Sequence, residues 1–302
     1  MTNIPLYIVS GFLGSGKTTF LKRVLQRYGR EMKIGIVQTE FPLSSVDYGF
    51  KDYSDISFAL LEINRGSASC ITISPDFCNT FNRFTDSEKP DIIFLETSGL
   101  TNLADIINML NSSLLKEKIS LKKIYTIIDA SRFDQEVTFL KSLKNQIRIS
   151  DVVVINKYEK LNRLESREVI LDSHIYKRIE NWIFSLNPFV TIIPAINSAL
   201  PDSEMLLFEK TQNISGNSSL ITKVMVSSAI YNVSDILSME KRLKIGERAL
   251  GYIRTDSGNI AFLFNNGISQ KDVYSAPIGE SVVLLSAGKA NISAFEKLFS
   301  DE

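Results

Sequence analysis

The feature that most limits how this chain can fold is a glycine-rich segment near its start, Gly-Phe-Leu-Gly-Ser-Gly-Lys-Thr at residues 11–18. It matches the Walker A pattern in full and stands between an apolar run, Leu6 to Val9, and a segment of helical period at 17–29. Glycines let the backbone curl so that successive N–H groups point at phosphate oxygens, and the following helix adds its positive end. A glycine-rich turn that matches by chance would not need this context. The segment therefore predicts a phosphate-binding loop between the first strand and the first helix.

Several positions of this loop have an expected role in holding a nucleoside triphosphate. Lys17 is expected to contact the β- and γ-phosphates, and the Thr18 hydroxyl is expected to ligate magnesium. Thr19 is included as a nucleotide contact, although packing against the helix or capping it is the alternative for this side chain. The candidate nucleotide-binding residues of the loop are Gly14, Ser15, Gly16, Lys17, Thr18 and Thr19.

Beyond the loop, short apolar runs alternate with segments of helical period. The runs lie at 33–37, 59–63, 91–95, 124–129, 152–155 and 190–193, and the helical segments include 103–117, 132–148 and 162–186. Strands that alternate with helices imply an α/β class with a mainly parallel sheet covered on both faces. Right-handed crossovers gather the loops that follow the strands at one edge, where ligands bind. We therefore predict a P-loop NTPase fold over residues 1–215.

A polar, unpatterned stretch at 212–219 interrupts this alternation and is typical of a linker. Two helical segments beyond it, near 233–245 and 291–299, are expected to pack on a small sheet. The strands expected in that sheet lie at 222–229, 249–254, 259–264 and 280–286. We predict a small C-terminal α+β domain over residues 216–302.

The overall composition bears on the cellular compartment of the protein and on the kinds of partner that it can bind. The chain carries 34 Lys and Arg against 34 Asp and Glu, so it lacks the net positive charge typical of nucleic-acid binding, although a local patch at Lys116 to Lys123 is the alternative. Its longest apolar runs have strand length, short of the ~20 residues that cross a bilayer, and its N-terminus has no basic leader. With only Cys70 and Cys78, no disulfide framework is expected. We expect a cytoplasmic protein without membrane or nucleic-acid partners.

A second acidic motif follows the apolar run at 91–95, where Glu96 is followed three residues later by Gly99. In P-loop proteins such an acid holds magnesium through water, and a glycine N–H at this spacing senses the γ-phosphate. A strand-end acid before a turn glycine is the alternative, and it is common in α/β proteins. Because a complete phosphate loop is also present, we interpret Glu96 as a magnesium-site residue and Gly99 as a nucleotide contact.

A third motif, Asn156, Lys157 and Glu159, follows the apolar run at 152–155 and is close to the Asn-Lys-x-Asp signature of guanine-specific NTPases. In that signature the carboxylate accepts two hydrogen bonds from the guanine edge, whereas adenine presents an acceptor there and is rejected. Glu159 keeps the charge but adds a methylene, so guanine preference is predicted and its strength is open. A polar strand-to-loop exit is the alternative.

In this order and spacing, the motifs resemble the CobW-type family of P-loop GTPases, relatives of the UreG and HypB metallochaperones. Further matches are Thr-Glu-Phe at 39–41, Val46 with Asp47, Glu-Ile-Asn-Arg-Gly at 62–66, Gln146 with Ser150 and Asp151, Leu-Asn-Pro at 186–188 and Arg-Ala-Leu-Gly at 248–251. The resemblance implies slow GTP hydrolysis, with GTP or GDP and magnesium as cofactors. Lys17, Glu96 and Glu40 are its candidate catalytic residues, and Thr18 and Glu96 its magnesium ligands. The implied client is a metalloenzyme or corrinoid protein. A homodimer is left open as a further form of the protein.

The chain also departs from this pattern. The family's metal loop reads Gly-Cys-x-Cys-Cys, whereas here Ser67 and Ser69 stand in place of two of the thiols and only Cys70 remains. Serine is a poor ligand for soft or borderline ions, so a tight zinc site is not expected. Pro42 replaces a flexible glycine of the switch region, while Glu40 and Asp47 keep their acids near the expected magnesium. A plain surface loop is the alternative for these two acids.

Three functions compete on this evidence. The first is an accessory GTPase whose switch segments, 39–70 and 97–105, change its affinity for a client when the γ-phosphate is lost. The second is a metal-carrying chaperone with a weak site at Cys70. The third is a module that binds nucleotide with little turnover. We take the first as the leading hypothesis.

Overall fold

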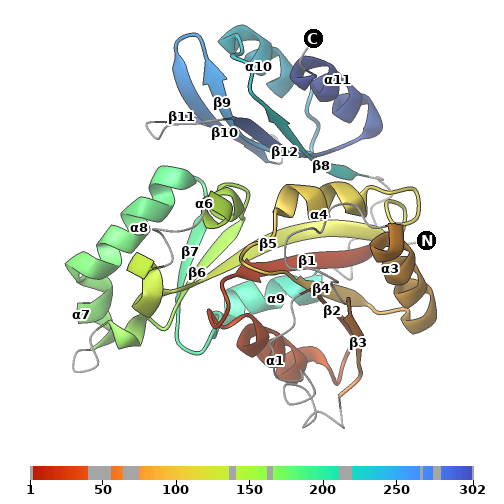
Figure 1. The fold of residues 1–302 in the computed structure, drawn as a ribbon, viewed down its shortest axis with the longest axis vertical. Coiled ribbons are helices and arrows are strands. Elements are labelled where there is room, and N and C mark those ends of the chain that lie inside the picture. The colour runs from red at the N-terminus through yellow and green to blue at the C-terminus, as the bar shows by residue number, and fades with distance from the viewer. Residues whose placement is uncertain are drawn as a thin grey trace.

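The computed structural model describes residues 3–39, 56–63, 75–135, 141–161, 166–210, 220–265, 268–274 and 280–300. Two sheets organise these residues (Figure 1). The first has seven strands in the order β3-β2-β4-β1-β5-β6-β7, and every neighbouring pair is parallel. The predicted α/β class with a P-loop NTPase type of sheet is therefore confirmed.

The central strands of this sheet are largely buried, because helices cover both faces. The strand bounds are β1 Ile4–Gly11, β2 Ile34–Gln38, β3 Phe58–Glu62, β4 Ile92–Glu96, β5 Ile119–Asp129, β6 Val152–Asn156 and β7 Thr191–Ala195. All five residues of β2, β4 and β6 are buried, as expected for strands covered on both faces. The polar residues that end β2, β4, β5 and β6 consequently meet at one edge of the sheet.

Alternate residues of these strands pack against two different helical layers. Tyr7 and Val9 share a core with α1, Lys17–Tyr28, and α9, Asp202–Lys210. Leu6 and Ile8 face the other way, toward the layer that contains α3, Pro75–Glu88, and α4, Leu103–Leu110. The remaining helices described are α6 Lys141–Arg148, α7 Arg167–Asp172 and α8 His174–Leu186, with short 3-10 turns η1 Ala130–Arg132 and η2 Tyr158–Lys160.

Two of the predicted helical segments differ in extent. The segment at 103–117 ends as α4 at Leu110, where Asn111 and two serines follow, residues that compete with the helical backbone for hydrogen bonds. The segment at 162–186 is broken at Ser173, which is extended and whose hydroxyl accepts from the Tyr176 N–H to cap α8. Both breaks come from side chains that satisfy the backbone locally.

The second sheet has five antiparallel strands in the order β11-β10-β9-β12-β8. Its strands are β8 Ile221–Ser227, β9 Arg248–Thr255, β10 Gly258–Asn265, β11 Ile268–Val273 and β12 Ser281–Ala287, and its helices are α10 Val233–Glu240 and α11 Lys289–Phe299. The two helices cover one face of the sheet (Figure 1). A sheet at the C-terminus was predicted, and it is observed. The predicted boundary near residue 215 lies outside the described residues.

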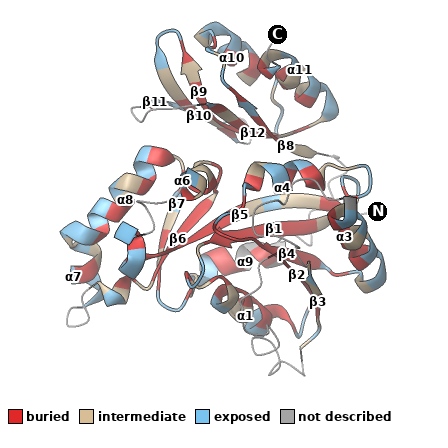
Figure 2. Ribbon diagram, in the orientation of Figure 1, coloured by how far each residue is buried: buried red, intermediate tan, exposed pale blue. Residues whose placement is uncertain are grey.

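The other face of the second sheet packs against the part of the chain built on the seven-stranded sheet, here called the first unit. Residues of both parts are buried together in one apolar core (Figure 2). The Asn108 side chain of α4 donates to the Val224 carbonyl at 3.2 Å and accepts from the Val224 N–H at 3.1 Å. The Tyr274 hydroxyl donates to the Leu186 carbonyl at 3.1 Å. Within the residues described, no helix has the length and apolar character needed to span a membrane.

Candidate nucleotide site

The phosphate loop adopts the conformation that its glycines permit. Gly11, Gly14 and Gly16 have φ values of 130°, 81° and 115°, which side chains other than glycine rarely adopt. A Cβ on Gly16 would come within 2.3 Å of the Asn156 amide nitrogen. The helix α1 begins directly after it, at Lys17. The loop therefore presents backbone N–H groups at the start of a helix, as an anion site requires.

Lys17 lies over the phosphate loop. Only 4% of this residue is exposed, and its Nζ donates to the carbonyls of Gly11 at 2.8 Å and Phe12 at 3.0 Å. The ammonium group is thus held within the curl of the loop, where it adds positive charge to the N–H groups. Thr19 is exposed on the first turn of α1.

The predicted magnesium residues, Thr18 and Glu96, are neighbours in space although 78 positions apart in the chain. The Thr18 hydroxyl donates to Glu96 Oε1 at 3.3 Å. Glu96 is 5% exposed, and its Oε2 accepts from the Gln38 amide at 2.6 Å. The pairing of β4 with β1 and β2 brings these strand ends together. A hydroxyl and a carboxylate at the mouth of a phosphate loop provide the hard oxygen ligands that magnesium prefers.

Gly99 packs directly against the phosphate loop. A Cβ at this position would come within 2.9 Å of the Phe12 Cα and 3.1 Å of the Gly11 carbonyl oxygen, so only glycine fits without movement. The Gln146 amide of α6 fixes the same turn by donating to the carbonyls of Ser98, Gly99 and Thr101 at 3.0–3.2 Å. The chain then enters α4 after Asn102, whose side chain caps that helix.

Asn156 joins the phosphate loop to the loop that follows β7. Its amide donates to the Ser15 carbonyl at 2.7 Å and to the Ser198 hydroxyl at 3.0 Å, while its Oδ1 accepts from the Ser198 N–H at 2.8 Å. The Ser198 hydroxyl donates to the Gly16 carbonyl at 2.9 Å. Ser198 has a φ of 56° and is 1% exposed, so these bonds hold it in a left-handed conformation.

Lys157 is held in the same network. Its Nζ donates to the Gly14 carbonyl at 2.6 Å and forms an ion pair with Asp129 at 2.7 Å. Asp129 is 1% exposed, and its other oxygen accepts from both the N–H and the hydroxyl of Ser131. Because Lys157 also has a φ of 60°, the turn after β6 is fixed at its backbone and at its side chain. The stem of Lys157 therefore runs back toward the phosphate loop.

Three polar atoms of these loops are buried and have no hydrogen-bond partner within the described residues. They are Glu159 Oε2, the Ser15 hydroxyl and the Thr97 hydroxyl. Burying a polar group without a partner costs about 1–3 kcal/mol, and more for a charged one. A carboxylate oxygen left in this state in the turn after β6 is suited to a ligand that donates hydrogen bonds to it.

The protein is similar to known nucleotide-binding proteins over most of its first unit. The family model described as CobW/HypB/UreG, nucleotide-binding domain, matches residues 5–181. The chain belongs to this family. The resemblance predicted from the motifs is therefore confirmed.

Individual relatives of this CobW/HypB/UreG protein share about a quarter of its residues over the aligned segments. It is 27% identical over 181 residues to the zinc chaperone CobW of Sinorhizobium sp. This alignment covers 51% of each of the two chains. It is 24% identical over 241 residues to zinc-regulated GTPase metalloprotein activator 1 of Dictyostelium discoideum, covering 67% of this chain and 48% of the relative. The chain thus spans about half the length of these curated relatives.

Among solved structures, the Zn(II)-bound YjiA GTPase from E. coli superposes with a TM-score of 0.51 at 15% identity, over 99% of both chains. At this identity the likeness shows that this CobW/HypB/UreG protein and YjiA share a fold.

The structure brings the three predicted loops together, and it adds residues that the sequence reasoning missed. Asp129 and Gln38 end buried strands, so the rule that selected Glu96 could have found them. Ser198 lies beyond the end of β7, so that rule would not have selected it. Gln146 was noted only as a point of resemblance, and nothing in the helical pattern indicates that its amide fixes the turn at Gly99.

The predicted switch and metal residues Glu40, Pro42, Asp47, Ser67, Ser69 and Cys70 lie outside the described residues. Within the residues described, there is no cluster of three or more His, Cys, Asp or Glu side chains that could hold a metal ion. Cys78 is a free, half-buried thiol on α3, and His174 is exposed at the start of α8.

Proposed function

We propose that this protein is a magnesium-dependent GTPase that acts as an accessory factor on a client protein. The observation that carries the proposal is the junction of the three loops: Thr18 with Glu96, Gly99 against Phe12, and Asn156 against Ser15. These contacts support a site in which the proposed phosphate, magnesium and base contacts gather around one loop. We treat residues 1–215 and 216–302 as its two working units.

The described residues fit magnesium. Thr18 would give its hydroxyl and Glu96 its carboxylate, with Gln38 orienting that carboxylate through its amide. When bound, the ion neutralises charge that develops on the phosphates. The protein's own part is to hold the triphosphate with the loop N–H groups, to add the Lys17 charge, and to place Gly99 where a γ-phosphate would lie.

Guanine is the proposed base. The unpartnered Glu159 oxygen supports this, because guanine offers N–H donors to a carboxylate and adenine does not. Lys157, held by Gly14 and Asp129, sets the turn that carries Glu159. The bound base would therefore restore a hydrogen bond that the described residues leave unmade.

Loss of the γ-phosphate would be transmitted from the turn at Gly99 to the second sheet. This turn leads into α4, and α4 holds β8 through Asn108. A change at Gly99 therefore has a direct structural route to the C-terminal unit. This route supports an accessory role in which nucleotide state alters client binding.

The proposed client is a metal- or cobalamin-dependent enzyme that this protein helps to mature. Two relatives carry names that include zinc chaperone or metalloprotein activator, which supports the client class. A metal-carrying role would need ligands outside the described residues. We expect little tightly bound zinc in the purified protein, and Ser67→Cys with Ser69→Cys should create a thiolate site that a chromogenic chelator can titrate.

The deciding experiment is nucleotide binding and single-turnover hydrolysis with GTP and ATP, each with and without magnesium. We expect saturable GTP binding that raises the melting temperature, and hydrolysis that needs magnesium. Binding without turnover would favour the nucleotide-binding module instead. No thermal shift with any nucleotide at millimolar concentration would refute the proposal as a whole.

A further inference from the structure

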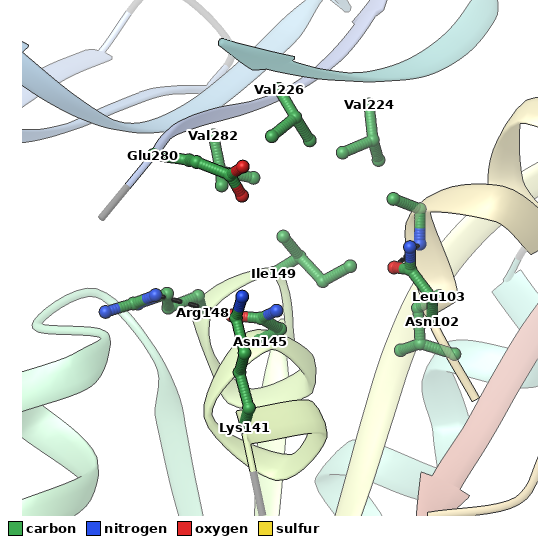
Figure 3. A pocket seen from close by; sticks show the side chains of 11 residues that line it. Asn102, Leu103, Lys141, Asn145, Arg148, Ile149, Val224, Val226, Glu280 and Val282 are labelled. Atoms are coloured by element: carbon green, nitrogen blue, oxygen red, sulfur yellow. Dashed lines mark hydrogen bonds between the residues drawn. The ribbon is translucent and has the colours of Figure 1, made fainter. Parts of the chain in front are cut away.

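A cleft of about 360 Å³ lies between the second sheet and the helices α4 and α6 (Figure 3). Its apolar walls come from α4, from the end of α6 and from strands β8 and β12. The side chains that form them are Leu103, Ile149, Val224, Val226 and Val282. Val226 is 48% exposed, and it is the exposed residue of a strand whose other residues are buried or half-buried. The cleft therefore offers an accessible aliphatic surface.

The same cleft borders the outer edge of β8, which side chains of α4 cover in part. β8 is the outer strand of its sheet, and its far side faces α4. The Asn108 side chain takes both backbone groups of Val224, and the Asn111 amide donates to the Thr222 carbonyl. Backbone groups of alternate residues point to the same side of a strand, so the N–H and C=O of Val226 also face outward. Neither group has a hydrogen-bond partner among the described residues outside its own sheet.

Charged groups flank the aliphatic wall. Lys141 and Asn145 project from α6 toward the cleft, and Glu280 reaches into it from the second sheet (Figure 3). Neither Lys141 nor Glu280 forms an ion pair with another described residue. Arg148, also in the lining, has a buried Nε with no hydrogen-bond partner within the described part of the chain. The lining of the cleft thus carries two cationic side chains and one carboxylate, so a bound segment that carries a carboxylate is favoured.

We propose that this cleft receives an extended segment of another protein. The segment adds to the edge of β8 by exchanging backbone hydrogen bonds with Val226, as in strand addition. It buries an aliphatic side chain against Leu103 and Val282, and it carries a carboxylate that faces Lys141 and Arg148. The inference stands apart from the GTPase proposal, because none of these contacts requires nucleotide.

The test uses the full chain and a fluorescein-labelled peptide of about ten residues in which valine and aspartate alternate. Fluorescence anisotropy should show saturable binding. A matched peptide with lysine in place of aspartate should bind about tenfold more weakly, because Lys141 and Arg148 would repel it. Unsaturable binding, or equal binding of the two peptides, would overturn the proposal.

Variants separate the backbone contact from the charge. Val226→Pro removes the outward N–H at a strand edge, where proline is tolerated, and should weaken the aspartate peptide about tenfold or more. Val226→Thr keeps that N–H, so it should reduce the affinity for the aspartate peptide less than Val226→Pro does. Lys141→Glu should weaken the aspartate peptide and strengthen the lysine peptide, while Lys144→Glu, on the exposed side of α6, should do neither.

Melting temperature and nucleotide affinity report whether each variant is folded. If Val226→Pro fails to fold, the opposite responses of the two peptides to Lys141→Glu decide the question alone. A Lys141→Glu protein that is folded and binds both peptides as the wild type does would sink the proposed site.

Discussion

The two ends of the proposed nucleotide site, one for the phosphates and one for the base, are held together by different kinds of contact. At the phosphate end, three glycines with positive φ and the close contact of Gly99 with Phe12 shape a loop of backbone groups, to which the Lys17 side chain adds its charge. At the base end, Asn156 and Ser198 hold the turn through side-chain hydrogen bonds. A backbone site depends on glycine and tolerates few substitutions, whereas a side-chain site can be tuned one bond at a time. Affinity should therefore belong to the first end and base selectivity to the second.

The largest effect is expected at Lys17. Lys17→Ala removes the charge that the phosphate loop encloses, and charge-assisted hydrogen bonds contribute about 1.5–3 kcal/mol. GTP affinity should fall on the order of 10- to 100-fold, with GTP and ATP affected alike. Isothermal titration measures both. Lys22→Ala on the same helix is the matched control, and an equal loss in that control would contradict a specific role for the Lys17 charge at the phosphate loop.

The next effect is expected at Gly99. In Gly99→Ala the new Cβ would come within 2.9 Å of the Phe12 Cα, so the turn must move away from the loop. Single-turnover GTP hydrolysis should slow about tenfold or more, while GDP affinity should change by less than about twofold if the turn moves and the phosphate loop keeps its place. Leu100→Ala, at a neighbouring exposed position, is the control. If GDP affinity fell as much as the hydrolysis rate did, Gly99 would maintain the shape of the phosphate loop in general, and the proposed γ-phosphate role would be wrong.

A smaller and more selective effect is expected at Glu159. Glu159→Ala should narrow the GTP over ATP preference by on the order of 1–3 kcal/mol, the usual cost of losing a charged hydrogen-bond site. Competition binding with both nucleotides gives this difference, and Lys160→Ala beside it is the control. Equal GTP and ATP affinities in the wild type would refute the guanine assignment and leave the phosphate end intact.

The smallest effect is expected at Ser198. Ser198→Ala removes the hydroxyl that accepts from Asn156 and donates to the Gly16 carbonyl, at about 0.5–1.5 kcal/mol per neutral bond. GDP affinity should fall a few-fold, and Ser203→Ala on the exposed surface of α9 should leave it unchanged. A loss as large as that of Lys17→Ala would erase the distinction between the two ends.

Sequence patterns predicted the parts of this protein that depend on local chemistry. The phosphate loop, the parallel sheet and the strand-end position of Glu96 all follow from residue spacing. Ser198 was missed, because its role depends on Asn156 reaching it across 42 positions of chain. The strand β11 was also missed: all six of its residues are exposed, and β10 is its one partner among the described strands, so no apolar alternation marks it. The break at Ser173 was hidden by helical periodicity on both sides.

Asn108 has a consequence for solubility. An outer strand with unpaired backbone groups is a template on which other chains can aggregate, and proteins commonly cover such strands. By taking both backbone groups of Val224, the Asn108 amide does for one residue what a neighbouring strand would do. This cover sits on α4, the helix that follows the turn at Gly99. The tendency of the protein to self-associate should therefore depend on how firmly that turn is held.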